Sequence, residues 1–321
     1  MDNSKISRKE ACEILSISTE TAKKWIKLNK LKMNDNKTFD KEYIENLAVE
    51  IKNNNHLKSR RNKKLKDNIE LYNGYINSYK NREAVKELVM RYENKQLSDN
   101  ELRLILVHFA KQLFNKTNNS NSQTFEVLIF DFLKNSAFEN INVENITLDF
   151  VPYEDTLGFI YLSLSALNSR KKNGMYFTPR RIANRLINNL SDSVNLKEKS
   201  ICDICCGSGN FLLALSRKGI SFNNIYGIDI DDICVSIARI NMFLNNTSLT
   251  IEQLYSHLIC NDALTNQNNK FDIIIGNPPW GFDYDKEYIK ELKKTYTVAK
   301  KKGFESYDLF LENGINLLND K

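Results

Sequence analysis

The feature that most constrains this chain is an apolar run that stops abruptly in a stiff loop. Residues 273–275 are three consecutive isoleucines, which is typical of a buried strand. The residues that follow are Gly276, Asn277, Pro278, Pro279 and Trp280. Because the prolines cannot continue a strand and fix the backbone angle φ, the loop is stiff. Open α/β sheets place their ligand sites in loops of this kind, at the carboxyl ends of strands.

The groups of this loop suit the recognition of an amino-bearing base. The amide oxygen of Asn277 and a proline carbonyl can both accept hydrogen bonds from an exocyclic amino group. Trp280 offers a flat face on which a base can stack. The chain has only four prolines, and two of them stand here. An ordinary turn after a strand would also explain this segment alone, so the neighbouring motifs decide its interpretation.

A glycine loop lies upstream, after an expected strand at residues 200–204. Asp203 precedes two glycines, Gly207 and Gly209, which allow a sharp turn and a close approach to a ligand. A dinucleotide fingerprint needs a third glycine where this chain has Leu212, so the loop does not specify a dinucleotide. The carboxylate of Asp203 could instead hold the ammonium group of a ligand, directly or through water.

Two more acids follow expected strands. Asp229 ends a strand at residues 224–228, at a distance from the glycine loop that suits bonding to ribose hydroxyls. Asp262 follows a strand at residues 258–260 and could accept a bond from an adenine amino group. Each acid alone could be a solvated or capping carboxylate. Their order, within alternating strands and helices from about residue 166, predicts a doubly wound α/β domain with a nucleoside site.

These motifs together resemble the gamma class of N6-adenine DNA methyltransferases, as in type I and type IIG modification subunits. Residues 174–179, with Tyr176 and Thr178, resemble the Gly-x-x-Tyr-x-Thr-Pro segment that closes over S-adenosylmethionine in that family, with one residue fewer between the glycine and the tyrosine. The similarity covers about residues 150–318. It implies a Rossmann-like S-adenosylmethionine-dependent domain. The cofactor residues that it implies are Tyr176, Thr178, Asp203, Gly207, Gly209, Asp229 and Asp262, and the catalytic residues are Asn277, Pro278, Pro279 and Trp280.

The resemblance implies direct in-line methyl transfer to the N6 atom of an adenine turned out of the duplex. Stacking on Trp280 could return about 1–3 kcal/mol of the cost of unstacking. Two alternatives stay open. Glutamine methyltransferases of release factors also carry Asn-Pro-Pro-aromatic, so the substrate could be protein or RNA. The chain could also be a non-catalytic DNA-binding remnant of a methyltransferase.

The amino-terminal segment predicts a small helix-turn-helix. Residues 6–31 read as two helices, with Ser7 and Glu10 at the spacing of a capping box. The segment resembles winged-helix DNA-binding domains of the MerR and excisionase type, with a wing at residues 32–38 and a closing helix at 40–51. That resemblance turns four side chains toward DNA: Thr19, Glu20, Lys23 and Lys24. A helical protein-docking module is the alternative.

Positive charge is concentrated in the amino-terminal part of the chain. Residues 1–66 carry 17 Lys and Arg against 9 Asp and Glu, although the whole chain has a net charge of only +6. Residues 52–66 hold seven of these bases, including Arg60 and Arg61, and no acid. We interpret this stretch as a basic linker that contacts the DNA backbone or is simply solvated. Residues 67–165 are expected to be a mostly helical domain that precedes the catalytic domain at 166–321.

Composition narrows the class of protein. No apolar run approaches the length of a transmembrane helix. The six cysteines do not form two pairs at the spacing of zinc ligands. This disfavours a zinc site and favours reduced thiols in a cytoplasmic protein.

The resemblance ends with a helix expected to finish at about residue 318. In the family, three further strands, a second wall of the base pocket and a target-recognition domain follow. We therefore expect a sheet of four strands whose last strand has a bare edge, and little or no activity from this chain alone. The chain would be a fragment, a truncated product or one half of a split enzyme. Its partners would be double-stranded DNA and a complementing C-terminal chain or a specificity subunit.

Overall fold

The structure, a computed structural model, describes most of the chain. The described residues are 5–15, 19–27, 31–34, 36, 38–53, 74–93, 95–117, 121–134, 140–165, 178–265, 269–281, 284–301 and 303–319. Contacts divide the chain into two compact units, Met1–Leu71 and Tyr72–Lys321. Tyr176, Arg60 and Arg61 lie outside the described residues, so their expected roles stay predictions.

The first unit contains the helices expected there. Helices α1 (Arg8–Leu15) and α2 (Thr19–Lys27) are followed by α3 (Lys41–Asn53), and strands β1 (Lys5–Ile6) and β2 (Phe39–Asp40) pair antiparallel. The capping box at the start of α1 is confirmed, because Ser7 N donates to Glu10 Oε2 at 2.8 Å and Glu10 N donates to Ser7 Oγ at 3.3 Å. Thr19 and Lys23 are exposed on α2, whereas the side chains of Glu20 and Lys24 lie outside the described residues. The winged-helix assignment and the DNA contact stay predictions.

The second unit begins with helices that are also predicted by the sequence. The elements are α6 (Tyr79–Arg91), α7 (Asp99–Asn115), α8 (Ser122–Leu133) and α9 (Thr156–Leu164). The apolar run at residues 125–133 forms a helix although its composition suits a strand, because it packs between α7 and the later helix α13. The predicted boundary at residue 165 stays a prediction, and the helices on both sides of it share one hydrophobic core.

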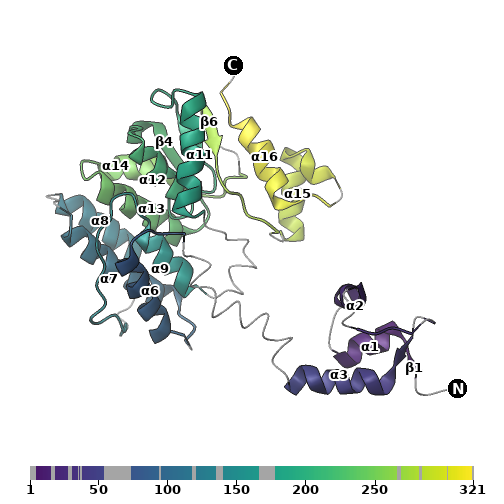
Figure 1. Ribbon diagram of the computed structural model, residues 1–321. Helices are drawn as coiled ribbons and strands as arrows, with labels where there is room; N and C mark the ends of the chain where they lie inside the picture. Colours follow the sequence, from purple (N-terminus) through teal and green to yellow (C-terminus); the bar gives the residue numbers. More distant parts are fainter. Residues whose placement is uncertain are drawn as a thin grey trace. The chain divides into compact units, whose positions relative to one another are not determined.

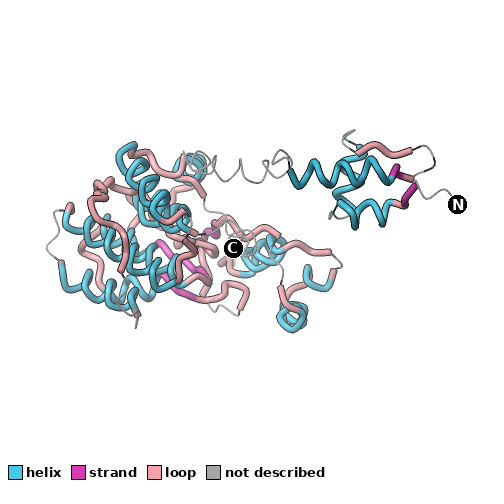
Figure 2. Tube along the Cα trace, turned by 90° about the horizontal axis from the view of Figure 1, so that it is seen from below, coloured by secondary structure: helices cyan, strands magenta, loops and turns pink. Residues whose placement is uncertain are grey.

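A parallel sheet forms the centre of the second unit, as predicted. Strands β3 (Ile201–Asp203), β4 (Ile225–Asp229), β5 (Leu258–Cys260) and β6 (Ile273–Ile275) pair in the order β5-β4-β3-β6. All three pairings are parallel, so the carboxyl ends of the strands lie at the same edge. The neighbouring helices are α11 (Arg180–Ser193), α12 (Asn210–Arg217), α13 (Asp232–Asn245) and α14 (Ile251–His257). Figures 1 and 2 show the strands enclosed among helices.

Side chains of alternate strand residues belong to two different cores. Ile201 and Ile225 pack into the large core with α12, α13 and the earlier helices. Cys202 and Ile228 pack into a smaller cluster that includes Leu317, beyond the last helix. This alternation follows from the two-residue period of a strand, and it explains why the strands read as continuous apolar runs.

The last part of the chain covers the other side of β6. It comprises α15 (Lys286–Thr295), a short 3₁₀ helix η2 (Val298–Lys300) and α16 (Ser306–Asn316), and Figure 1 shows α15 and α16 side by side. The last helix ends two residues before the expected end at about residue 318. Helix α16 ends at Asn316, and Leu318 forms a parallel bridge with Phe271 at the start of the β6 segment. In the described residues β6 is the last strand of the sheet on this side.

None of the helices in the described ranges combines the length and apolar character of a membrane span. All six cysteines are free.

Candidate active site

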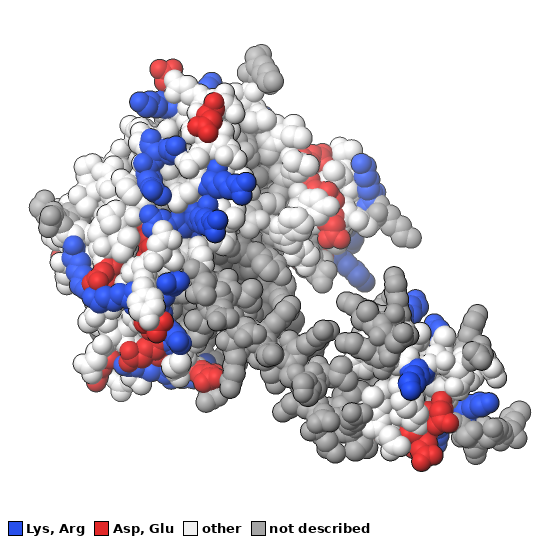
Figure 3. All heavy atoms as spheres, viewed as in Figure 1, with Lys and Arg blue, Asp and Glu red and all other residues white. Residues whose placement is uncertain are grey.

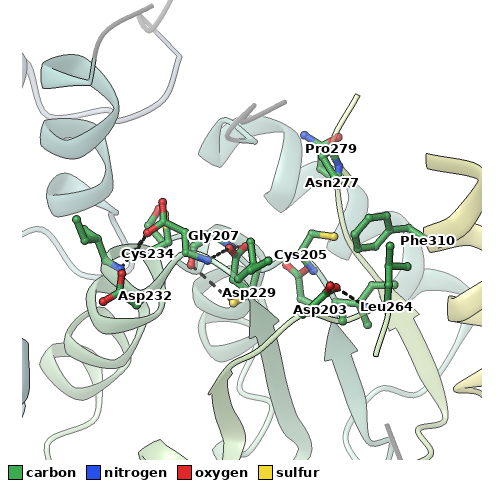
Figure 4. A pocket seen from close by; sticks show the side chains of 18 of the residues that line it. Asp203, Cys205, Gly207, Asp229, Asp232, Cys234, Leu264, Asn277, Pro279 and Phe310 are labelled. Atoms are coloured by element: carbon green, nitrogen blue, oxygen red, sulfur yellow. Dashed lines mark hydrogen bonds between the residues drawn. The ribbon is translucent and has the colours of Figure 1, made fainter. Parts of the chain in front are cut away.

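A cavity of about 830 Å³ lies at the carboxyl ends of the parallel strands. It is lined by loops that follow all four strands, and Thr178 also reaches it from the segment before α11. Figure 4 shows Asp203, Asp229, Asn277 and Pro279 around this one space. Residues from separate motifs therefore meet at the carboxyl edge of the sheet, where open α/β sheets bind their ligands.

Asp203 ends β3 at the bottom of the cavity and is almost fully buried, with 1% of its surface exposed. Its Oδ1 atom accepts a hydrogen bond from Cys205 N at 3.0 Å. Its Oδ2 atom is buried and has no hydrogen-bond partner in the described residues. Burial, reinforced by the negative charge of Asp229, raises the pKa of Asp203 to about 7. A buried oxygen of this kind lacks a donor, which an ammonium group of a ligand would supply.

Asp229 ends β4 and fixes the shape of the glycine loop. Its Oδ2 atom accepts from Gly207 N at 2.8 Å, and its Oδ1 atom accepts from Asp231 N at 2.9 Å. Burial raises the pKa of Asp229 to about 6. Each carboxylate oxygen has a second lone pair, so the group can still accept from two hydroxyls of a ligand. Gly207 adopts a positive φ of 52°, which a residue with a side chain rarely does.

A network of buried polar side chains holds the glycine loop from behind, which we call the Asp155 network. Asp155, the cap of α9, is fully buried and accepts from Tyr75 Oη at 2.6 Å, from Asn241 Nδ2 at 2.6 Å and from Ser208 Oγ. Asn210 Nδ2 also donates to it, at 3.3 Å. Burial raises the pKa of Asp155. The glycine loop is therefore tied to the helical region as well as to the sheet.

The loop after β6 brings Asn277 and Pro279 into the cavity. Gly276 begins the loop, and a Cβ atom there would lie 3.1 Å from Asp203 Oδ1, so a side chain at this position would press on the buried carboxylate. Pro279 is held from α16, because Ser306 Oγ donates to the Pro279 carbonyl at 2.5 Å. Trp280 is 55% exposed and packs against Tyr307 with ring centroids 5.1 Å apart. The arrangement joins buried acids to a polar loop with an exposed aromatic ring.

Residues 153–320, slightly more than half of the chain, match the family model described as N-6 DNA Methylase. This match covers the glycine loop, the acids and the loop after β6.

The chain belongs to the N-6 DNA methylase family.

Two other relatives are methyltransferases of different kinds. The type II methyltransferase M.VspI of Vibrio sp. is 28% identical over 177 residues, which are 55% of this chain and 42% of that protein. A release factor glutamine methyltransferase of Clostridium botulinum is 28% identical over 162 residues, 48% of this chain and 55% of that protein. The match therefore spans about half the length of these curated relatives.

Solved structures with a similar chain path are more distant. A putative class I S-adenosylmethionine-dependent methyltransferase from Listeria monocytogenes has a TM-score of 0.44 at 22% identity, covering 75% of this chain and 69% of that one. The type I restriction-modification methyltransferase subunit from Streptococcus thermophilus has a TM-score of 0.38 at 18% identity, covering 79% of this chain and 60% of that one.

Most of the site residues predicted from the sequence of this chain line the cavity. The lining residues among them are Thr178, Asp203, Gly207, Asp229, Asp262, Asn277 and Pro279. Gly209, Pro278 and Trp280 do not line it. Gly209 instead caps α12 with a φ of 97° and packs close to Ala238. The particular role of each residue stays a proposal.

The methylase site also contains residues that the sequence interpretation missed. Asp262 does not stand alone: its Oδ1 atom accepts from Leu264 N at 2.9 Å, and Tyr288 Oη donates to its Oδ2 atom. Tyr288 comes from α15, and burial is the largest of the effects that raise the pKa of its hydroxyl group. No local pattern marks this residue, because its contact with Asp262 depends on how α15 packs. Asp155 had a local signal, since it precedes a helix and can cap it.

No group of three His, Cys, Asp or Glu side chains in the described part of the chain is placed to hold a metal ion.

Proposed function

We propose that this chain is the cofactor-binding and catalytic part of a methyltransferase that transfers a methyl group from S-adenosylmethionine to N6 of adenine in DNA. The observation that carries the proposal is the meeting of Asp203 and Asp229 with Asn277 around one cavity, in a chain of the N-6 DNA methylase family. M.VspI, a type II methyltransferase, is the relative that favours DNA and a restriction-modification context.

The buried acids fit the polar groups of S-adenosylmethionine. The Oδ2 atom of Asp203 lacks a donor and would receive the ammonium group of the methionine end. Asp229 would accept from the ribose hydroxyls, and Asp262 would lie at the adenine ring beside Tyr288. Bound in this way, S-adenosylmethionine would supply a methyl group on a sulfonium, an electrophile that requires no covalent enzyme intermediate.

The loop after β6 would position the target base. The Asn277 side-chain oxygen and the Pro278 carbonyl would accept the two hydrogens of N6, which frees the nitrogen lone pair from ring conjugation. Ser306 holds the neighbouring Pro279 carbonyl, so the loop geometry is set before the base arrives. Trp280 would stack on the base, and its exposure of 55% leaves a face free to do so.

The experiment that tests this function is methyl transfer from labelled S-adenosylmethionine to DNA, RNA and protein. We expect the label to appear as N6-methyladenine in DNA and to disappear in Asn277→Ala. Label in a protein glutamine would favour the second candidate, which the release factor methyltransferase of C. botulinum represents.

Double-stranded DNA and other restriction-modification subunits are the proposed partners. The amino-terminal unit would add DNA contacts through α2, on which Thr19 and Lys23 are exposed. This part of the proposal rests on the excess of basic residues in 1–66 and on the pair of helices α1 and α2. A shift of duplex DNA by the intact chain that is unchanged in Thr19→Ala/Lys23→Ala would argue against it.

A further inference from the structure

A second, smaller cavity of about 500 Å³ lies against α11, outside the site described above. One wall is the polar face of this helix, and the other is the segment that precedes α6. Its lining residues are Gly74, Asn77, Arg180, Arg181, Asn184, Arg185, Asn188 and Asn189. The lining contains three arginines, four asparagines and no acid. These side chains donate hydrogen bonds in abundance, which is the chemistry of an anion site and not of an apolar ligand site.

The lining residues follow the period of the helix. Arg181 and Arg185 are four residues apart, as are Asn184 and Asn188, so they form adjacent rows on one face of α11. The opposite face is apolar, and Ala183 and Ile187 are buried there. The arginines therefore stand on a rigid helix that is fixed to the core.

Arg180 differs from the other two arginines because it forms an ion pair with Glu154. Its Nη1 atom donates to Glu154 Oε2 at 3.2 Å, and the same carboxylate oxygen accepts from Asn77 N at 2.8 Å. Glu154 thereby joins the start of α11 to the opposite wall of the cavity. The Nε atom of Arg180 is buried and has no acceptor in the described residues. Burial lowers the pKa of Arg180, with Glu154 opposing that shift.

Arg181 and Arg185 are exposed, and neither forms an ion pair with a carboxylate in the described part of the chain. Figure 3 shows Lys and Arg side chains gathered over the part of the second unit that contains α11. Residues 1–66 carry an excess of eight positive charges, and the whole chain has a net charge of +6. Residues 67–321 therefore carry slightly more acidic than basic side chains, so positive charge is not general in this part of the chain. Unpaired arginines held close together repel one another, so an anionic partner would stabilise them.

We propose that this arginine face of α11 contacts the phosphodiester backbone of duplex DNA. The inference rests on the proposed function, and it adds a DNA contact outside the amino-terminal unit and outside the loop after β6. The position fits, because Thr178 lines the catalytic cavity and stands two residues before Arg180. Helix α11 has 14 residues and is about 21 Å long, so the phosphates of a strand that enters the active site can follow the helix.

The test measures duplex DNA binding by the full chain at a series of salt concentrations. Each phosphate contact contributes about 1 to the slope of log affinity against log salt. We expect Arg181→Ala/Arg185→Ala to lower that slope by about 2 and to weaken binding equally on all sequences. The charge-retaining Arg181→Lys/Arg185→Lys should keep the slope of the parent. The amino-terminal unit contributes equally to all these proteins, so the difference isolates α11.

The matched control is Lys86→Ala/Lys111→Ala, which removes two positive charges from α6 and α7. We expect it to leave the slope unchanged. An equal fall in this control, an unchanged slope in the arginine variant, no duplex binding by the parent, or a larger loss on duplex RNA than on duplex DNA would each overturn the inference. Calorimetry with S-adenosylmethionine separates it from the proposed function. All three double variants should bind the cofactor like the parent, whereas a parent that binds none refutes the proposed function itself.

Discussion

The two halves of the candidate site are built in opposite ways. Asp203, in the cofactor half, is 1% exposed and accepts a hydrogen bond from Cys205 N, and Ser208 of the following glycine loop donates to the Asp155 network. Trp280, in the target half, is 55% exposed; its ring packs against Tyr307, and its Nε1 atom donates to Asn277 Oδ1 at 3.4 Å. The first half is organised by the core of the protein, and the second is organised by one stiff loop and two contacts from α16, made by Ser306 and Tyr307.

This difference has an energetic consequence. Buried acids with raised pKa values destabilise the empty protein and gain most from a bound cation or donor. An exposed aromatic ring costs little in the empty protein and contributes only when a base stacks on it. We therefore expect changes in the cofactor half to alter stability and cofactor affinity together. Changes in the target half should alter target affinity alone.

The largest expected effect is that of Asp203→Asn. Removing this charge should weaken S-adenosylmethionine binding at least about 100-fold, which is roughly 3 kcal/mol, because the ammonium group loses its partner. The empty variant should be more stable than the parent above pH 7. The reason is that the folded-state pKa of about 7 exceeds the unfolded value, so stability falls as pH rises from about 4 to about 7. Calorimetry and thermal unfolding at pH 5 and pH 8 measure both effects.

Equal unfolding temperatures for the parent and the Asp203→Asn variant at pH 8, together with equal affinities for S-adenosylmethionine, would show that Asp203 is an ordinary buried carboxylate.

The next effect concerns the support behind the glycine loop. A Cβ atom at Gly158 would overlap Asp155 Oδ2 and Ser208 Oγ, both in the buried network. We expect Gly158→Ala to destabilise the fold by about 3 kcal/mol, although alanine favours a helix. Gly74→Ala is the matched control, because no atom lies within 4 Å of its Cβ position. Denaturant unfolding distinguishes the two, and similar midpoints would contradict the importance of the network.

A smaller effect is expected at the ribose position. Asp229→Ala should weaken S-adenosylmethionine binding by more than about tenfold, or 1.4 kcal/mol. It also removes the acceptor for Gly207 N, so the glycine loop should become more mobile. Calorimetry gives the affinity, and hydrogen exchange of the loop amides reports the mobility. Unchanged affinity would remove the ribose role from Asp229.

Of these substitutions, Trp280→Ala in the target half should have the smallest effect on stability and on S-adenosylmethionine affinity. Because the ring is largely exposed, we expect stability and S-adenosylmethionine affinity to change by less than about 0.5 kcal/mol. Binding of DNA with an unpaired adenine should weaken by about 1–3 kcal/mol through lost stacking. Trp280→Phe should retain most of this binding. A large loss of cofactor affinity in Trp280→Ala would mean that the two halves are not separable.

The sequence was sufficient to predict the elements whose signals are local. The strands β3, β4, β5 and β6 and the capping box at Ser7 follow from short patterns. The convergence of Asp203, Asp229 and Asn277 also follows, because parallel strands share one carboxyl edge.

Features that depend on packing between distant segments could not be predicted in this way. Tyr288 meets Asp262, and Tyr75 meets Asp155, across long stretches of chain that no local pattern connects. The two-residue difference at the end of α16 has a related reason. Leu318 leaves the helix to pair with Phe271, and a partner so far away in sequence leaves no mark in the residues around it.

The central claim is that the buried acidic half of the site binds S-adenosylmethionine. The most direct test is titration calorimetry of the intact chain with S-adenosylmethionine and, separately, with NADH. Leu212 occupies the position of the third glycine of a dinucleotide fingerprint, so the account predicts one site for S-adenosylmethionine and no heat with NADH. Binding of NADH, or no binding of S-adenosylmethionine by the folded chain, would contradict it.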